Sequence, residues 1–215
     1  MAYSLRLIED RLAPGAAVPP PRAGVHRVLY AVSGALRSAP NGESFPAVGP
    51  GVDSVTAGTD GARVYRFELL RQPTSQAGGR LLLEHPIDLA ATPAWLMRCD
   101  RVDFDPGSVA PPHRHRGGGI RCLLRGGLEV TVGAGAPRLM RPGDAWFESG
   151  RDPVLAVSSR EAETSFIRVS VLPQEIRGRS SILYVDPAGA SRGRPRRYTV
   201  HVDEPIALGG AACAS

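Results

Sequence analysis

The sequence lacks lysine entirely, and all 26 of its basic residues are arginine. It holds three cysteines, Cys99, Cys122 and Cys213, and none is part of a CxxC pair. An odd number without such a pair argues against a disulfide framework and against a structural zinc site. No apolar run approaches the roughly 20 residues that a membrane helix needs. The first fifteen residues carry acidic side chains where a secretory signal would have its apolar core. We therefore expect no membrane association and a cytoplasmic location.

The basic balance of the chain, a net charge of +5, raises the question of a polyanionic partner. The densest basic run is SRGRPRRY at residues 191–198, which is short and contains glycine and proline. No nucleic-acid recognition module is visible elsewhere in the sequence. We expect a solvated loop at this run and no nucleic-acid partner.

Glycine and proline are abundant, with 25 and 20 residues, and they divide the chain into short apolar runs. Many short strands at close spacing are typical of a β-sandwich or a small β-barrel. The sequence therefore predicts an all-β protein with few helices. The expected strands cover residues 27–34, 62–70, 95–104, 120–126, 128–133, 145–149, 153–159, 165–173 and 197–205.

Two parts of the chain repeat each other at a constant offset of 92 residues. The matching positions are mostly turn-forming glycines and prolines, and a shared offset at such positions indicates a duplicated unit. The matches are Pro14-Gly15 with Pro106-Gly107, Pro19-Pro20 with Pro111-Pro112, Arg22 with Arg114, Gly34 with Gly126, Pro50-Gly51 with Pro142-Gly143, and Gly58 with Gly150.

The second unit alone carries a histidine pair, since His113 and His115 are matched by Pro21 and Ala23. Alternate side chains of a strand share one face, so the two imidazoles are expected to point the same way. Two neighbouring imidazoles are a common ligand arrangement for iron, nickel, zinc or copper. Glu148 is the nearest acidic candidate for a third ligand. Alternatively, the pair binds a substrate directly or has no role.

Two further residues are candidates for contact with a ligand. Counting by twos from His113 leads to Arg121, which would point into the same interior. There it would clamp a carboxylate ligand in bidentate fashion, or it would form an internal ion pair, for example with Glu148, because an unpaired buried charge is very costly. An irregular strand would turn it outward. Trp146 either lines a cavity and stacks on a ligand or belongs to the barrel core.

Residues 104–172 resemble the cupin superfamily, and residues 14–70 resemble it weakly. The first cupin motif is matched by Gly107, the HxH pair and Gly126, and the second by Pro142-Gly143-Asp144. The resemblance implies a bicupin, that is, two jelly-roll barrels in tandem with the first one degenerate. We expect a degenerate unit at 1–75, a connector at 76–94, the HxH barrel at 95–173, and a C-terminal extension with a returning strand at 174–215.

The resemblance also implies a divalent metal held by three histidines and a glutamate. This sequence departs from that ligand set, because the glutamate position falls at Gly119 or Ile120 and the last histidine at about Val154. A metal here, whether Fe, Mn, Ni, Zn or Cu, would depend on His113, His115 and Glu148.

Three hypotheses about function follow. The first is a metal-dependent enzyme of oxygenase, isomerase or lyase type, acting on a small acidic or cyclic organic molecule that Arg121 and Trp146 contact. The second is a non-catalytic cupin that binds a small molecule without metal, and the third is a structural bicupin with a filled barrel. We expect the ligand to be anionic and the protein to form a homodimer that covers exposed sheet edges.

Overall fold

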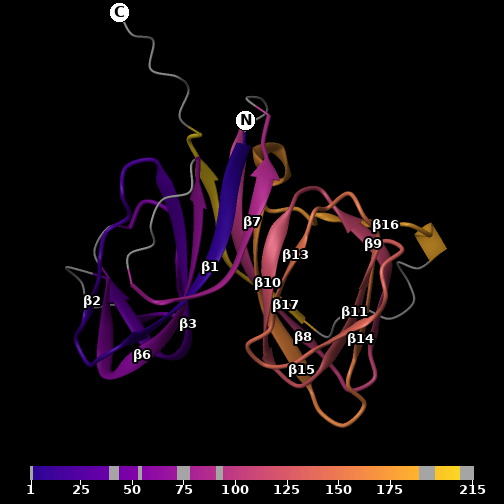
Figure 1. The fold of residues 1–215 in the computed structure, drawn as a ribbon, viewed down its shortest axis with the longest axis horizontal. Coiled ribbons are helices and arrows are strands. Elements are labelled where there is room, and N and C mark those ends of the chain that lie inside the picture. Colours follow the sequence, from indigo (N-terminus) through magenta and orange to yellow (C-terminus); the bar gives the residue numbers. More distant parts are fainter. Residues whose placement is uncertain are drawn as a thin grey trace, which may run out of the picture. The chain divides into compact units, whose positions relative to one another are not determined.

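The fold was obtained as a computed structural model, which describes residues 2–38, 44–52, 55–71, 78–90, 94–188 and 197–208. Within these ranges the chain is built from antiparallel strands, and its helical residues form short 3-10 segments such as the turn Gln174–Ile176 (Figure 1). No helix in the described ranges is long and apolar enough to cross a membrane. The prediction of an all-β protein with few helices is confirmed. The chain divides into two compact units, Met1–Met97 with Val202–Ser215, and Arg98–His201.

The first unit is one curved antiparallel sheet with the order β4-β3-β6-β1-β7 among its described strands. The long strand β6 pairs with β1 on one side and with β3 on the other, so these three strands form the wall of the first barrel. An apolar cluster at one end of that wall includes Leu29, Leu36, Val55 and Val64. The strands are β1 (Ala2–Leu12), β2 (Ala17–Val18), β3 (Val25–Ser38), β4 (Ser44–Phe45), β5 (Ala47–Val48), β6 (Val55–Leu70) and β7 (Arg80–Asp88).

The second unit holds two five-stranded sheets with the orders β13-β10-β15-β8-β17 and β12-β11-β14-β9-β16. One apolar cluster takes side chains from both sheets, including Phe104 and Phe166 from the first sheet and Val130 and Ala156 from the second, so the sheets pack face to face. The strands are β8 (Trp95–Phe104), β9 (Val109–His115), β10 (Gly119–Arg125), β11 (Leu128–Val132), β12 (Arg138–Met140), β13 (Ala145–Glu148), β14 (Val154–Ser158), β15 (Thr164–Pro173), β16 (Ile182–Tyr184) and β17 (Arg197–Ile206).

Three of the four repeated glycine pairs have the same backbone conformation in the two units; in the fourth, Gly150 has φ +80° but Gly58 is not among the glycines with positive φ. Gly34 and Gly126 have φ of +74° and +75°, and an added Cβ would lie 2.2 Å from the Gly61 carbonyl oxygen and 2.4 Å from Thr164 Oγ1, respectively. Only glycine fits such a position without displacing its neighbours. The pairs Gly15 with Gly107 and Gly51 with Gly143 also share positive φ. The constant offset in the sequence therefore marks equivalent turns in the structure.

The structure contains strands that the sequence patterns did not indicate. Residues 2–12 form β1, and the range 76–94, expected as a connector, contains β7, which pairs with β1. Charged residues interrupt the apolar pattern of both strands, and β7 is mostly exposed or half-buried, so neither has a clean alternation. Within the expected extension, β16 pairs with β9 and β17 lies beside β8. Residues 191–196 of the basic run lie outside the described residues.

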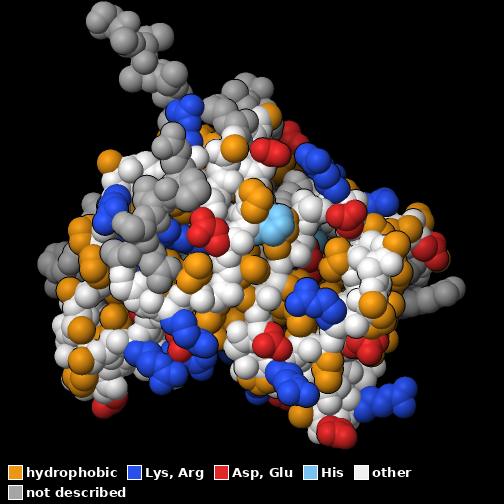
Figure 2. Space-filling view, in the orientation of Figure 1, with side chains coloured by type: hydrophobic (Ala, Val, Ile, Leu, Met, Phe, Trp, Pro, Cys, Tyr) orange, Lys and Arg blue, Asp and Glu red, His pale blue; other side chains and the backbone are white. Residues whose placement is uncertain are grey.

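Basic and acidic side chains are interspersed on the face drawn in Figure 2. The positive net charge of the sequence is therefore distributed over this face among acidic neighbours, and does not gather in one basic region of its described residues.

Candidate functional site

Strand β9 places the two histidines on the interior face of the second barrel. His113 and His115 are 8% and 6% exposed, and their ring centroids lie 4.9 Å apart with the planes at 89°. This is the shared face that strand alternation predicts. His113 Nδ1 lies 2.7 Å from the carbonyl oxygen of Pro111, to which it donates a hydrogen bond. Its Nε2 therefore carries the lone pair.

Glu148 on β13 is the centre of a buried polar cluster. Its Oε2 lies 2.7 Å from Arg121 Nη2 and 3.4 Å from His115 Nε2, and its Oε1 accepts a hydrogen bond of 2.8 Å from Trp146 Nε1. The arrangement follows from register, because Arg121 faces Trp146 across β10 and β13 and Glu148 is two residues further along. Arg121 is therefore inside the barrel, paired with Glu148, which is the ion-pair alternative considered from the sequence.

The guanidinium of Arg121 is held on two sides. Its Nη1 donates a hydrogen bond of 2.6 Å to the carbonyl oxygen of Gly119. Its Nη2 approaches Glu148 closely, but the N–H direction is not aligned for a hydrogen bond to that carboxylate, so the attraction between the two is mainly Coulombic. With 1% of Arg121 exposed, water does not screen this pair.

The protonation states of the cluster follow from burial and neighbouring charge. Burial lowers the pKa of His115 to about 3, although the hydrogen bond to Glu148 opposes the shift. Burial also lowers the pKa of Arg121 to about 10, which leaves it protonated at neutral pH. For Glu148, burial alone would raise the pKa, but the charge of Arg121 and the contacts from His115 and Trp146 overcome it and hold the pKa below its usual value. At neutral pH the cluster is an arginine–carboxylate pair beside a neutral imidazole.

The donor set of this cluster does not fit a bound metal. Both oxygens of Glu148 already have partners, and a cation beside Oε2 would stand next to the positive charge of Arg121. The neutral His115 donates its Nε2–H to Glu148, so its remaining nitrogen is Nδ1, which is buried and has no hydrogen-bond partner among the described residues. Within the described ranges, no group of three or more His, Cys, Asp or Glu side chains is arranged to hold a metal ion.

The two positions at which cupin-like ligands are absent are closed by packing. Val154 is buried and faces His113 across β14 and β9, so an aliphatic side chain stands where a third imidazole was expected. At Gly119 an added Cβ would lie 2.4 Å from the carbonyl oxygen of Val169, so no glutamate side chain fits there. Gly117 has a similar close approach, at 2.2 Å from the carbonyl oxygen of Val171. These glycines allow β15 to approach.

The interior of the second barrel is almost filled. The cavity beside the histidines has a volume of about 20 Å³, which is room for about one water molecule. Trp146 is 3% exposed and packs edge-on against Phe166 at 5.5 Å. Arg168 and Asp100, which the sequence analysis did not single out, form a buried bidentate pair at 2.8 and 2.6 Å on the same wall. Their signal in the sequence is a charged residue of each sign inside an apolar strand.

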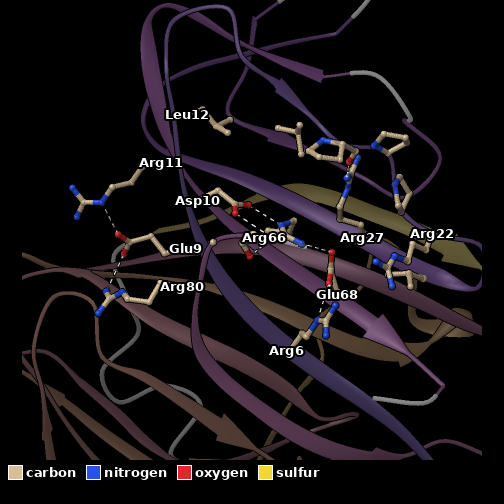
Figure 3. Close-up of a pocket in the computed structure, with 17 residues that line it drawn as sticks. Arg6, Glu9, Asp10, Arg11, Leu12, Arg22, Arg27, Arg66, Glu68 and Arg80 are labelled. Carbon is tan, nitrogen blue, oxygen red and sulfur yellow. Dashed lines mark hydrogen bonds and ion pairs between the residues drawn. The ribbon is translucent and has the colours of Figure 1, made fainter. Parts of the chain in front are cut away.

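The first barrel contains a much larger cavity, of about 950 Å³ (Figure 3). Among the described residues that line it are six arginines and three carboxylates. Arg66 lies at the centre, where it binds Asp10 at 2.7 and 3.1 Å and Glu68 at 2.7 Å. This site was not predicted from the sequence. Its signal is the alternation of charged with apolar residues in LRLIED and RFELL, which places charges of both signs on one strand face.

Solved structures with the same fold were found at low sequence identity. A mutant of oxalate decarboxylase from Bacillus subtilis matches with a TM-score of 0.57 and 13% identity, over 85% of this chain and 71% of that one. A protein described as glyoxylate-induced from Pseudomonas aeruginosa matches with 0.53 and 18%, over 80% and 75%. A mutant of salicylate 1,2-dioxygenase from Pseudoaminobacter salicylatoxidans, in complex with gentisate, matches with 0.52 and 12%, over 78% and 68%.

No family model matches the chain, and no curated protein matches it. The structural neighbours are cupin-fold proteins of bicupin type, and each is matched over more than two thirds of its length. The chain therefore has the bicupin fold, with two cupin-type jelly-roll barrels in tandem, as the sequence resemblance implied. At these identities the likeness is one of fold.

Proposed function

We propose that this chain is a metal-independent bicupin that binds a small molecule in the cavity of its first barrel, while its second barrel is a closed structural unit. The observation that carries the proposal is the filling of the second barrel. Arg121 holds a positive charge against Glu148, and about 20 Å³ of space remains beside them. The first barrel offers about 950 Å³, which is within the range of small-molecule pockets.

Burial explains why the second barrel favours a structural role. A bound metabolite would need the Arg121–Glu148 pair to open, and separating two buried charges without water is costly. The imidazoles are also neutral, so they add no positive charge that could attract an anion. The ligand of the proposed function therefore belongs to the first barrel.

The proposal is tested by screening small organic molecules for stabilisation of the full chain in a thermal-shift assay, with and without EDTA. A ligand that binds only the folded state raises the melting temperature, and the rise grows with the logarithm of the ligand concentration above the dissociation constant. We expect stabilising ligands whose effect is unchanged by EDTA. Stabilisation that EDTA abolishes and that an added divalent metal restores would contradict metal independence.

The second candidate function is the metal-dependent enzyme, of oxygenase, isomerase or lyase type on a small acidic or cyclic molecule. The convergence of His113 and His115 on the barrel interior favours it. It requires His113, His115 and Glu148 to hold Fe, Mn, Ni, Zn or Cu, and therefore requires Arg121 to leave Glu148. Titration of the wild-type chain with Co²⁺ tests this, because Co²⁺ bound by imidazole and carboxylate gives visible absorption bands, and we expect none.

A homodimer is also part of the proposal. In the second unit β17 is an edge strand that carries Tyr198 and Val200, which are 40% and 53% exposed. Edge strands with apolar side chains are commonly covered by a second copy. Light scattering of the full chain after size-exclusion chromatography should give the mass of two chains, and the mass of one chain would contradict it.

A further inference from the structure

The charges on the inner wall of the first barrel indicate which class of small molecule the cavity accepts. We infer that it binds an organic anion, a carboxylate on an apolar body, with the carboxylate at the end of the cavity where Arg6 and Arg27 lie. This inference rests on the proposed function and specifies the ligand of the same cavity.

Strand register places the charged side chains of this wall in rows. Arg6 on β1 faces Glu68 on β6, and Glu68 in turn faces Arg27 on β3, so one row reads arginine, glutamate, arginine. In the next row Arg66 on β6 stands between aliphatic neighbours on β1 and β3. Asp10 belongs to the third row. All five side chains point to the same face because their positions alternate along each strand.

The two carboxylates of these rows are shared among the arginines. Glu68 contacts Arg6 at 2.6 Å and Arg66 at 2.7 Å, and Asp10 takes two hydrogen bonds from Arg66 (Figure 3). Arg27 donates a hydrogen bond to the carbonyl oxygen of Pro19 and faces Glu68 across the strands. The five side chains, three positive and two negative, are between 4% and 9% exposed. They therefore carry a net positive charge at a buried surface.

A net positive charge in such a place favours an anionic guest. The lining of the whole cavity holds six arginines and three carboxylates, and this excess of positive charge attracts an anion into the cavity. A planar guanidinium matches a carboxylate in bidentate geometry, which makes arginine the usual residue for this recognition. Arg22, exposed at the rim of the same cavity, adds a second positive charge that would attract an anion toward the opening.

The other side of the cavity is apolar, which indicates that the part of the ligand beyond its carboxylate is apolar too. Leu12 and Val18 line the cavity on this side, and both also pack with the apolar cluster of the first barrel. An aliphatic or aromatic body would bury apolar surface there. A hydrated inorganic anion would leave this surface uncovered, so the geometry favours an amphiphilic organic anion.

The experiment compares matched pairs of probes by isothermal titration calorimetry with the full chain in the presence of EDTA. The pairs are 4-phenylbutyrate with 4-phenylbutanamide, and hexanoate with hexanamide, which differ mainly in charge. Because a charge-assisted hydrogen bond is involved, we expect each carboxylate to bind about 10- to 150-fold more tightly than its amide. Arg27→Gln should weaken the carboxylates by a similar factor and change the binding of the amides little.

Arg141→Gln is the matched control, since it removes the same charge from an exposed position in the second unit. It should leave all affinities unchanged. Arg22→Gln provides a second test that does not depend on a buried substitution, and it should weaken carboxylate binding by less than Arg27→Gln because of solvent screening at the rim.

Three outcomes would overturn the inference: amides that bind as tightly as the carboxylates, carboxylate affinity that is unchanged in Arg27→Gln, or no saturable binding of either carboxylate. Binding of the amides alone would refute the anionic ligand and leave the metal-independent binding function standing. Carboxylate binding to the wild type that appears only when EDTA is replaced by a divalent metal would instead refute the proposed function.

Discussion

Removal of Arg121 tests whether this residue stabilises the fold through its ion pair with Glu148. In Arg121→Met the aliphatic part of the side chain is preserved, but Glu148 loses its counter-charge inside a barrel where both residues are buried. Breaking a buried pair by removing one partner costs about 3–5 kcal/mol. For a chain of this size, that cost corresponds to a fall in melting temperature of about 6–20 °C.

The double variant Arg121→Met with Glu148→Gln is the matched control. It removes both charges, while the amide oxygen of the glutamine can still accept the hydrogen bond from Trp146 Nε1. Since no unpaired charge is left behind, the double variant should recover most of the stability that the single variant loses. Urea unfolding at neutral pH, followed by circular dichroism, measures both.

The pH dependence of the same variants has a definite sign. In the wild-type chain the pKa of Glu148 lies below its ordinary value, so the stability contributed by this carboxylate is present above pH 4.5 and lost as the pH falls through the lowered pKa. In Arg121→Met burial dominates and raises that pKa, so the deficit relative to wild type is largest at neutral pH and shrinks on acidification. A single variant as stable as wild type at neutral pH, or one whose deficit grows on acidification, would refute this reasoning.

The remaining predictions concern other residues of the second barrel. Trp146→Phe removes the indole N–H bonded to Glu148 and should cost about 1.5–3 kcal/mol in urea unfolding; no change would mean that the bond contributes nothing. The pKa of His115 is about 3 in the folded chain and 6.5 ordinarily, so between pH 6.5 and 3 the unfolded chain binds a proton that the folded chain does not. Acidification through this range should therefore lower the stability of the wild type by up to about 1.4 kcal/mol per pH unit more than that of His115→Gln. Parallel pH dependence of the two chains would contradict it. Gly143 has φ +93° and no atom within 4 Å of an added Cβ, so Gly143→Ala should lower the stability by about 1–2 kcal/mol through backbone strain alone. Gly126→Ala should lower it more, because its Cβ would also meet Thr164. Equal losses of stability in the two variants would argue against this close approach.

Local patterns in the sequence were sufficient to predict much of the second unit. Most of its strands were bounded to within one residue, because each is a short apolar run that ends at Gly, Pro, Asp or Ser. The alternation rule placed His113 and His115 on one interior face of β9. Arg121 also points into the barrel, but residues 116–118 break the strand and β10 belongs to the other sheet, so the count by twos did not follow one regular strand. The constant offset predicted a duplicated unit, and the resemblance of its motifs to the cupin superfamily implied the bicupin fold. Gly15, Gly34 and Gly51 share positive φ with their matches in the second unit.

The partners of buried charges could not be predicted in the same way. Whether Arg121 faces a ligand or Glu148 depends on the register of β10 with β13, which brings together residues 27 positions apart. The cavity of the first barrel depends on three strands, β1, β3 and β6, of which β1 was not recognised because charged residues interrupt its apolar pattern. Cavity volume arises from side chains that are distant in the sequence, and single-strand patterns carry no information about it.

The metal content of the full chain, purified without a histidine tag from medium that contains Fe, Mn, Ni, Zn and Cu, tests the metal independence of this bicupin most directly. Elemental analysis should find far less than one ion of any of these metals per chain, and EDTA should leave the melting temperature unchanged, because Arg121 already supplies the positive charge beside Glu148. Close to one ion per chain, lost on EDTA treatment together with stability and regained only while His113, His115 and Glu148 are intact, would contradict the account.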